Sequence, residues 1–584
     1  MVTLAAPSAV DRPLTLAQVA GKYPDVPRLI ILKADVQRRG VHYTEGALAE
    51  LDENRHQILG THIFGARDGK IELRPESVLL RDGTSIITTP TPLDQNPYVV
   101  DRVGGKLFLT DRGEAIEEVE YWPRPDYYAK ETASGTPMRY VVSARPKRLS
   151  IFPYRYCQFW NNHKGCLFCD IVPQLKRGKE QGIPARVAPE EVAAVVREAL
   201  KEPGRFTGLC MTGGSVLTGK EPLDDEVDYY IKVLKAIGQN FEGGRFTSQL
   251  IATAFSEKQL RRLHDETGLS SYTADIEVLN EAMFNWICPG KAAAVGYAEW
   301  KRRLVHAARI FGRGHVDTSI VAGVELARPH GFTSEEEALQ ATLNEAEDLA
   351  RQGVVTVQTV WAPRPNAALG LQKNASLEYY VRMTKGLHDL RVKYDLPVEF
   401  DDFRNCGNHP DTDFSRVPVI ESAIADLPIK LSKELVAALK DPSTLSSLAT
   451  SDASGAPNVT LGLWLAVEED GAIAYLEPLQ ASVTNRNLTH SLWFNRPVAL
   501  AVTSKDGQRW QIRGVPVKAH VCGPVFRRHY ERIRREVGDT DLAAVWIIEP
   551  RAVEDESLKQ AAHDALHPSF GHLDLILKKE ELHA

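Results

Sequence analysis

The sequence predicts an α/β protein built around a complete or partial TIM-type (βα) barrel, with a small β-rich domain before it and an all-β barrel after it. Between residues 147 and 400, short β-rich runs alternate with long amphipathic stretches, as in repeated βα units around a parallel sheet. Outside that region the runs are short and separated by Gly, Pro and Asp turns. The 584 residues allow about three domains. We expect domains at 1–145, 146–403 and 431–584, with 404–430 as a linker or lid.

The composition is that of an ordinary globular protein. Hydrophobic residues make up 43% and charged residues 25%, which argues against disorder and against a coiled-coil rod. There are 70 Lys and Arg against 77 Asp and Glu, a net charge of −7, so general nucleic-acid binding is not expected. Apolar runs fall short of the ~18 residues of a membrane span, and the first residues lack a basic segment followed by an apolar core. We expect a cytoplasmic protein without a membrane segment.

The central region has a regular pattern that predicts its elements in order. The β-rich runs predict strands at 148–154, 206–212, 246–252, 271–277, 316–323, 354–360 and 397–401. The amphipathic stretches predict helices at 188–201, 224–238, 256–265, 295–311, 334–352 and 376–394. The active site of such a barrel lies at the carboxyl ends of its strands. An open, doubly wound sheet is the alternative.

The flanking regions carry fewer chemical signals. Residues 1–145 predict one helix around 45–54, followed by β-runs such as IELRPESVLLRDGTSIITT and GGKLFLTDRG, and no residue there stands out chemically. The segment NCGNHPDTDFSRVPV is polar and rich in turns. From Leu431 a helix precedes hairpins such as LSSLATSDASGAPNVTLGLWLAV, which predicts an all-β barrel.

Three of the seven cysteines lie close together in the text RYCQFWNNHKGCLFCD, whereas the others are too scattered for a disulfide framework. Cys157, Cys166 and Cys169 can hold three irons of a 4Fe-4S cluster and leave the fourth open. Together with His163 they also suit a tetrahedral zinc ion. Unliganded buried thiols are the third alternative, and spacing alone does not decide among the three.

The surroundings of these cysteines resemble the radical S-adenosylmethionine (SAM) superfamily, biotin-synthase-related type. The cysteines follow the first predicted strand, Phe168 precedes the last of them, and the next strand ends in CMTGGS. The gap of eight residues between the first two cysteines departs from the superfamily's commonest spacing, and Ser215 stands where Glu usually follows the two glycines. The resemblance implies that Cys157, Cys166 and Cys169 bind a catalytic 4Fe-4S cluster whose open iron binds SAM.

Further motifs continue the resemblance over roughly residues 147–400. TADIEVLN places two carboxylates on one face of the fourth strand, and FNWICPGK is followed by a fifth strand reading SIVAGVE. The sixth strand ends in TVWAPRP. The residues that the resemblance implies for SAM binding are Phe168, Gly213, Gly214, Ser215, Asp275, Glu277, Ile320, Gly323, Glu325 and Val360. Structurally, the two carboxylates are equally interpretable as solvated charges at a strand end.

The resemblance also implies a chemistry and its partners. A reduced cluster would cleave SAM to a 5′-deoxyadenosyl radical, which abstracts hydrogen from a small-molecule substrate that the sequence does not identify. Flavodoxin or ferredoxin is the expected reductant. Biotin synthase holds a second iron–sulfur cluster, for which Cys210, Cys288 and Cys406 are candidates here. They form no compact ligand motif, so we expect no second cluster.

Residues 431–555 resemble the pyridoxamine-phosphate-oxidase-like split barrels, a family that binds flavin. The segment ASVTNRNLTHSLWFNRPVALAV matches the family's FMN-phosphate region, with Arg486 and Asn487 opening a helix that would hold the phosphate. The alternative is that these two residues merely cap a surface helix. The resemblance makes FMN a candidate cofactor and the split barrel a candidate homodimer interface. Two other functions are a flavin- or haem-binding oxidoreductase whose first part is only a scaffold, and a non-catalytic zinc protein.

Overall fold

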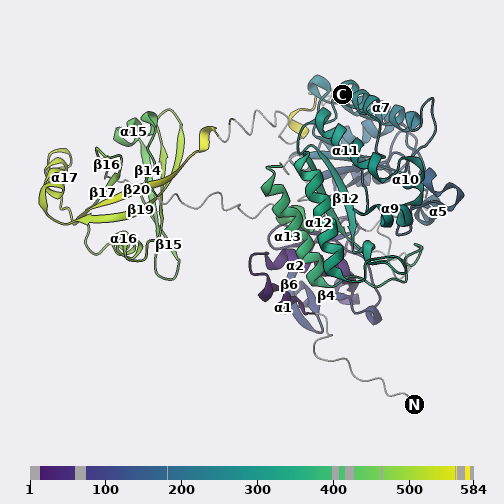
Figure 1. Ribbon diagram of the computed structural model, residues 1–584, viewed down its shortest axis with the longest axis horizontal. Coiled ribbons are helices and arrows are strands. Elements are labelled where there is room, and N and C mark those ends of the chain that lie inside the picture. The colour runs from purple at the N-terminus through teal and green to yellow at the C-terminus, as the bar shows by residue number, and fades with distance from the viewer. Residues whose placement is uncertain are drawn as a thin grey trace, which may run out of the picture. The chain divides into compact units, whose positions relative to one another are not determined.

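The chain forms two compact units. The structure, a computed structural model, describes residues 14–58, 74–145, 147–180, 182–396, 407–414, 427–461, 464–558, 561 and 573–578. One unit comprises Met1–Val419 together with Ser569–Ala584, and the other comprises Ile420–Pro568. Both contain helices and strands, so the protein is mixed α/β (Figure 1). The second unit is therefore inserted into the chain of the first.

A seven-stranded sheet forms the centre of the first unit, in the order β13-β12-β11-β10-β9-β8-β7. Neighbouring strands from β8 to β13 run parallel, and β7 pairs with β8 antiparallel. The strands are β7 (Val142–Ala144), β8 (Arg148–Ile151), β9 (Gly208–Thr212), β10 (Ser248–Ile251), β11 (Ser271–Thr273), β12 (Val316–Ala322) and β13 (Val354–Val360). Among the described residues no ladder joins β13 to β7, so the sheet is open.

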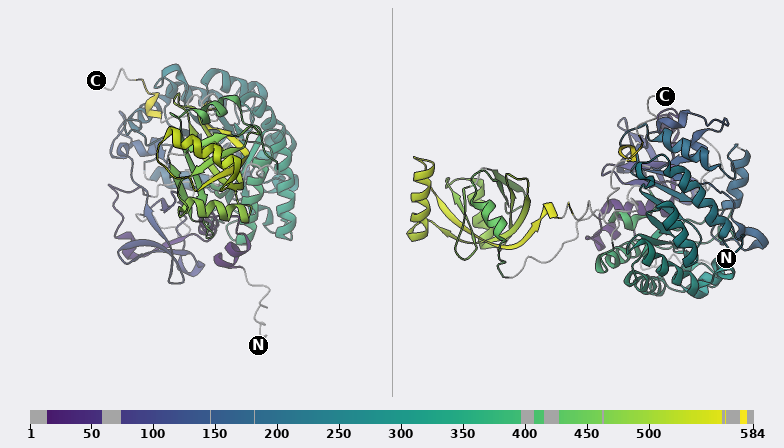
Figure 2. Two further views of the ribbon diagram at one scale, coloured as in Figure 1. Left: turned by 90° about the vertical axis from the view of Figure 1, so that its left-hand side faces the viewer. Right: turned by 90° about the horizontal axis from the view of Figure 1, so that it is seen from above.

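Helices connect the parallel strands and lie along the outside of the curved sheet, as Figures 1 and 2 show. They are α5 (Ile171–Glu180), α6 (Pro189–Ala199), α7 (Asp224–Gly238), α8 (Glu257–Thr267), α9 (Glu281–Ile287), α10 (Pro289–Ala294), α11 (Tyr297–Phe311), α12 (Glu335–Arg351) and α13 (Leu377–Lys393). Local sequence sets several of their starts. Ser334 and Ser376 accept hydrogen bonds from the first turns of α12 and α13, and acidic residues occupy the first turn of α7.

These elements match the central part of the sequence prediction. The first six predicted strands correspond to β8–β13, and the six predicted helices correspond to α6, α7, α8, α11, α12 and α13. The seventh predicted strand, 397–401, lies outside the described residues. The sequence did not predict α5, α9 or α10. A closed TIM barrel is not seen in the described ranges, and the open sheet is what they contain.

The N-terminal part of the chain packs beside the central sheet. Its six-stranded sheet has the order β1-β4-β5-β6-β2-β3. The strands are β1 (Val41–Tyr43), β2 (Ser77–Leu80), β3 (Ser85–Ile87), β4 (Tyr98–Val103), β5 (Lys106–Asp111) and β6 (Glu114–Tyr121). The helices are α1 (Leu16–Lys22), α2 (Arg28–Arg39), α3 (Glu45–Leu48) and, just before β7, α4 (Met138–Val141). The predicted helix at 45–54 is therefore only the short α3, and the longer α2 was missed.

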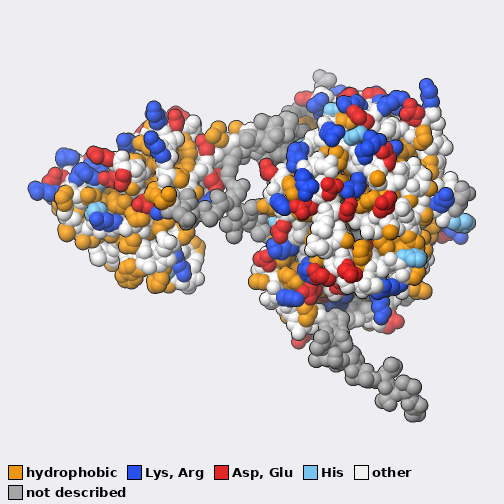
Figure 3. All heavy atoms as spheres, in the orientation of Figure 1, with side chains coloured by type: hydrophobic (Ala, Val, Ile, Leu, Met, Phe, Trp, Pro, Cys, Tyr) orange, Lys and Arg blue, Asp and Glu red, His pale blue; other side chains and the backbone are white. Residues whose placement is uncertain are grey.

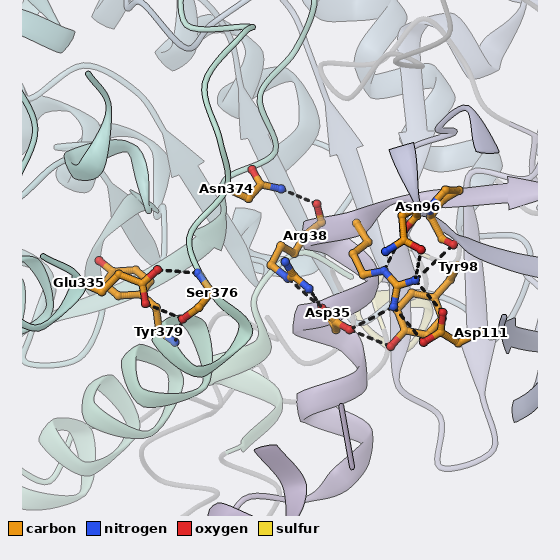
Figure 4. Close-up of polar contacts among 11 residues, drawn as sticks. Asp35, Arg38, Asn96, Tyr98, Asp111, Glu335, Asn374, Ser376 and Tyr379 are labelled. Atoms are coloured by element: carbon orange, nitrogen blue, oxygen red, sulfur yellow. Dashed lines mark hydrogen bonds and ion pairs between the residues drawn. The ribbon is translucent and has the colours of Figure 1, made fainter. Parts of the chain in front are cut away.

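Helix α2 joins the N-terminal sheet to the central one. Ile30 and Ile31 pack into the core of the central sheet, whereas Leu32 and Val36 pack into the core of the N-terminal sheet. Polar contacts reinforce both sides, as Figure 4 shows: Asp35 accepts from Tyr98, and Arg39 from the same helix pairs with Asp111. On the other side, the Asn374 amide donates to the Arg38 carbonyl at 2.6 Å. The N-terminal part thus belongs to the same compact unit as the central sheet.

Residues 407–414, predicted as part of a linker or lid, are buried in the first unit. They form a turn followed by α14 (Pro410–Phe414). Asp413 accepts from Lys33 on α2 at 2.5 Å, and Asp411 pairs with Arg391 on α13 at 2.7 Å, with all four side chains almost inaccessible to solvent. Buried charges need partners, so these pairs fix α14 between two helices. The composition of the segment suggested an exposed linker because its acidic residues have no cationic neighbours in sequence.

The last described residues also pack on the first unit and not on the barrel. Leu573 and Leu577 are buried there, and Leu577 forms a bridge with Phe241. Backbone hydrogen bonds from Leu573 to Phe206 and from Glu242 to Ile576 hold the segment in place. The predicted domain at 431–584 therefore ends earlier in the structure.

The second unit contains a seven-stranded antiparallel sheet in the order β15-β14-β18-β19-β20-β17-β16, curled around its own core. Its strands are β14 (Leu445–Ser451), β15 (Pro457–Leu461), β16 (Trp464–Val467), β17 (Ile473–Glu477), β18 (Val498–Thr503), β19 (Arg509–His520) and β20 (Ala544–Asp555). Its helices are α15 (Lys433–Lys440), α16 (Val483–Trp493) and α17 (Gly523–Glu536). This agrees with the predicted helix followed by hairpins.

Charged side chains of both signs are interspersed over the visible face of the first unit (Figure 3). In the described part of the chain, no helix has both the length and the apolar character that crossing a membrane requires.

Candidate functional site

A cavity of about 350 Å³ opens at the carboxyl ends of the parallel strands in the first unit. Most of the residues predicted to form a site line this one cavity. They are Cys157, Cys166, Phe168, Cys169, Gly213, Gly214, Ser215, Asp275, Glu277 and Val360. They come from positions separated by up to two hundred residues, and the parallel sheet brings them together because all its strands end at the same edge.

The three cysteines lie on the loop after β8, and each thiol is influenced by the others. Backbone N–H groups of Ser215 and Phe159 donate to the Cys157 sulfur, and the first N–H of α5 donates to the Cys169 sulfur. Burial nevertheless raises the pKa of Cys157 to about 11, and the neighbouring Cys166 adds to this effect. Burial also raises the pKa of Cys169. Such thiols ionise only when a positive group, such as a metal centre, binds them.

The arrangement fits a cluster better than a single ion. In the part of the chain that the structure describes, no three His, Cys, Asp or Glu side chains are placed to hold one metal ion. His163, the fourth candidate ligand for zinc, is exposed to solvent and does not line the cavity. A 4Fe-4S cluster takes one thiolate per iron, so its cysteines stand farther apart than the ligands of one ion. The three thiols around one cavity therefore suit the cluster and leave the zinc alternative without support.

The three other candidate cysteines do not form a second set of ligands. Cys210 on β9 lines the cavity. Cys288 lies between α9 and α10, fully buried, and its thiol shares a hydrogen bond with Cys166. Cys406 lies outside the described residues. Cys288 thus belongs with the first group of cysteines.

Gly213 and Gly214 let the loop after β9 approach the cysteine loop. A Cβ at Gly214 would lie 2.2 Å from the carbonyl oxygen of Tyr156, and one at Gly213 would lie 2.6 Å from that of Tyr154. The Gly214 amide donates to the Tyr154 carbonyl at 3.0 Å. A side chain at either position would push the two loops apart, so these glycines shape the wall of the cavity beside the cysteines.

A buried carboxylate that the sequence analysis missed lies behind Ser215. Ser215 and Thr253 line the cavity, and their hydroxyl oxygens are 2.7 Å apart. Thr253 in turn contacts Glu226 on α7 at 3.0 Å, and the Val216 amide donates to the same carboxylate at 2.7 Å. Burial raises the pKa of Glu226 to about 7. Because Glu226 lies eleven positions after Ser215 within an acidic helix start, its sequence position did not distinguish it from surface charge.

The two carboxylates after β11 have different partners. Lys291 donates to Glu277 at 2.7 Å and to the Asp275 carbonyl at 2.5 Å, and its ammonium lies 4.8 Å from the centre of the Trp300 ring. The Asp275 side chain accepts from the Ser319 amide at 2.9 Å. Burial, followed by the charge of Glu277, raises the pKa of Asp275 to about 7. Glu277 is thus held in an ion pair, and Asp275 has no cation bonded to its side chain in the described residues.

The structure corrects part of the prediction for β12. Ile320 is buried away from the cavity, because the alternation of the strand points Asp317, Ser319 and Val321 into it. Gly323 has a φ of 100°, and a Cβ there would lie 2.5 Å from the Tyr380 hydroxyl oxygen. Its amide donates to Glu325 at 2.9 Å. Glu325 also accepts from Tyr379, so the side chains of Ile320, Gly323 and Glu325 support the strand end and do not line the cavity.

Residues from outside the central sheet close the cavity on another side. Gln37 of α2, Thr89 and Arg145 line it, together with Asn408 and His409 from the buried segment before α14. The His409 Nδ1 bonds to the Gln358 carbonyl at 2.8 Å, and burial lowers the pKa of His409 to about 4. The ring is therefore neutral near pH 7, and its Nδ1 carries the proton. The sequence gave no chemical role to residues 1–145, because only the fold places them here.

The predicted phosphate site in the second unit does not form around Arg486 and Asn487. Helix α16 begins at Val483, and its N-cap Ser482 accepts from the Asn485 amide. Ser482 in turn donates to the buried carboxylate of Glu477 at 2.8 Å. Arg486 is exposed, whereas Asn487 is buried and donates to Thr450 at 3.1 Å. The helix start already faces a carboxylate, which would repel a phosphate, so the residues present do not fit FMN at this point.

Comparisons with known proteins find one curated relative. The chain is 23% identical over 393 residues to a bacteriochlorophyllide c C-7(1)-hydroxylase of Chlorobaculum limnaeum, covering 64% of this chain and 89% of that protein. No protein-family model matches.

Solved structures resemble only about a fifth of the chain. HupZ of Group A Streptococcus matches with 17% identity and a TM-score of 0.19, covering 22% of this chain and 94% of that one. An F420 reductase matches with 18% identity and a TM-score of 0.18 over 22% and 98% of the two chains. An FMN-binding protein of Syntrophomonas wolfei matches with 15% identity and a TM-score of 0.18 over 21% and 87%. Matches of this extent decide neither the fold nor the function.

Proposed function

We propose that this protein is a radical SAM enzyme in which Cys157, Cys166 and Cys169 bind a 4Fe-4S cluster and the adjoining cavity binds SAM and a small-molecule substrate. The observation that carries the proposal is that three thiols, two glycines and an unpaired carboxylate meet in one cavity at the carboxyl ends of a parallel sheet. The relationship to a hydroxylase supports an enzyme that acts on a carbon centre. With SAM bound, the reduced cluster supplies an electron that breaks the S–C5′ bond and yields a 5′-deoxyadenosyl radical, which abstracts hydrogen from substrate.

The residues of the chain would divide the binding of SAM among them. Asp275 is suited to accept hydrogen bonds from ribose hydroxyls, because no cation is bonded to its side chain in the described residues. Ser215, connected through Thr253 to the carboxylate of Glu226, is suited to accept from the amino group of the methionyl part. Val360 and Trp361 provide apolar wall. Gly213 and Gly214 keep the wall thin beside the cysteines.

The substrate would lie on the side of the cavity that the N-terminal part and residues 407–414 close. His409 is neutral there and can exchange hydrogen bonds without adding charge. Enclosure by these elements excludes water from a reactive intermediate. We propose an external flavodoxin or ferredoxin as electron source, because the described geometry of the second unit gives no fit for FMN at Arg486 and Asn487.

Anaerobic reconstitution with iron, sulfide, SAM and dithionite tests the proposal. We expect about four irons per chain and formation of 5′-deoxyadenosine and methionine. The variant with Cys157, Cys166 and Cys169 all changed to Ala should lose both, whereas Cys522→Ala, which removes an exposed thiol in the second unit, should keep both. Iron binding by the triple variant equal to that of the unaltered protein, or zinc in place of iron, would overturn the assignment.

A further inference from the structure

The segment Cys288-Pro289-Gly290-Lys291 has no role in the function proposed above, yet it packs directly against the cysteine loop. The Leu167 amide donates to the Ile287 carbonyl at 2.9 Å, and the Gly290 amide donates to the Lys164 carbonyl at 2.9 Å. A Cβ at Gly290 would lie 2.5 Å from that same carbonyl oxygen. The segment therefore sits as close to the loop carrying Cys166 as two backbones allow.

The Cys288 thiol is bonded to one cysteine of the site. It is fully buried at the junction of α9 and α10, where its carbonyl accepts from the Ala292 amide, so its position is fixed by both helices. Its partner is the Cys166 sulfur. A Cys166 bound to iron is a thiolate and has no proton to donate. The hydrogen bond must then run from the Cys288 S–H to the Cys166 sulfur.

Lys291 adds a positive charge on the same side. Its ammonium lines the cavity, is fixed by Glu277 and the Asp275 carbonyl, and lies over Trp300. Its charge lowers the pKa of Cys166 by more than the charge of its partner Glu277 raises it. The ion pair as a whole therefore favours negative charge at the Cys166 sulfur, although its two members have opposite signs.

We infer that Cys288 and Lys291 tune the cluster through Cys166, by a thiol hydrogen bond and a fixed positive charge that together stabilise its reduced form. Reduction adds an electron to a centre already bearing three thiolates. Hydrogen bonds to the sulfurs and nearby charge are among the factors that set the potential of such centres. Both residues act through Cys166, so they are positioning residues. The inference rests on the proposed function, since it requires the cluster.

The test is an anaerobic redox titration of the reconstituted full-length protein, followed by EPR in the absence of SAM, with iron and sulfide measured first. Cys288→Ala and Lys291→Met should each move the midpoint potential to more negative values. Cys288→Ser, which keeps a donor, should recover part of the shift. The double variant Lys291→Met with Glu277→Gln should shift less than Lys291→Met alone, because it removes both charges of the pair.

Two matched controls test whether any lost thiol or cation has the same effect. Cys522→Ala removes an exposed thiol in the second unit, and Lys301→Met removes an ammonium that pairs with Glu345 and Asp348 outside the cavity. Both should keep the potential of the unaltered protein. Unchanged potentials in Cys288→Ala and Lys291→Met at full iron content would overturn the inference. If Cys288→Ala binds too little iron to be titrated, an unchanged potential in Lys291→Met overturns it. Failure of the unaltered protein to bind iron would instead contradict the proposed function.

Discussion

Lys291 and Glu277 form a buried ion pair, with 2.7 Å between the ammonium nitrogen and a carboxylate oxygen, and this pair makes the two carboxylates after β11 unequal. The sequence placed Asp275 and Glu277 on one face as equivalent candidates. In the structure Glu277 has its charge neutralised, and its backbone has a φ of 70°. Asp275 accepts one backbone hydrogen bond and has oxygen capacity left for a ligand.

This difference predicts how SAM binding responds to substitution and to pH. Asp275→Asn should weaken SAM binding by about 1.5 to 3 kcal/mol, the range for a hydrogen bond to a charged group, and leave the iron content unchanged. Because the pKa of Asp275 in the free protein is raised to about 7, affinity should improve as the pH rises through that value and the carboxylate ionises. Calorimetric titration between about pH 6 and 8 measures both effects. An equal pH dependence in Asp275→Asn would show that another group is responsible.

The buried pair between α2 and α14 predicts a stability effect. Lys33 and Asp413 are both inaccessible to solvent, so Asp413→Ala leaves an uncompensated ammonium and should cost about 3 to 5 kcal/mol of unfolding free energy. The double variant Lys33→Met with Asp413→Leu should recover most of that loss, since both charges go. Denaturant unfolding measures the difference. As a control, Lys106→Met removes one member of an exposed pair with Glu118 and should change stability little. A double variant as unstable as the single one would show that packing, and not charge, fixes α14.

The sequence predicted the central sheet well because each strand and helix there carries its own local pattern. It failed for α2, whose residues Leu32, Lys33 and Val36 are buried on opposite sides, so no polar face marks the helix. It failed for α14 because the partners of Asp411 and Asp413 lie on distant helices. Ile320 was misassigned because alternation along β12 becomes visible only once the register with β13 is known. Glu226 and His409 reach the cavity only through tertiary structure.

The start of α16 predicts that Arg486 contributes nothing to flavin binding. Its side chain is exposed, and the N-terminal amides of the helix face Ser482 and the carboxylate of Glu477. Titration of the full-length protein with FMN, followed by flavin fluorescence, should give the same result for the unaltered protein and for Arg486→Glu. Weaker FMN binding by Arg486→Glu would restore the phosphate site that the sequence suggested.

The return of the chain to the first unit predicts that its C-terminal segment stabilises the part of the protein that holds the cavity. Leu573 is fully buried against that unit, so Leu573→Ala should lower its unfolding free energy by about 2 to 5 kcal/mol, the usual cost of emptying a buried leucine site. The matched control is Leu558→Ala, because that leucine is 67% exposed in the second unit. Since each unit has its own core, thermal unfolding should show two transitions, of which Leu573→Ala lowers the one belonging to the first unit. Limited proteolysis identifies that transition by the fragments released as it proceeds. A shift confined to the second unit, or none at all, would mean that residues 573–578 do not hold the two ends of the first unit together.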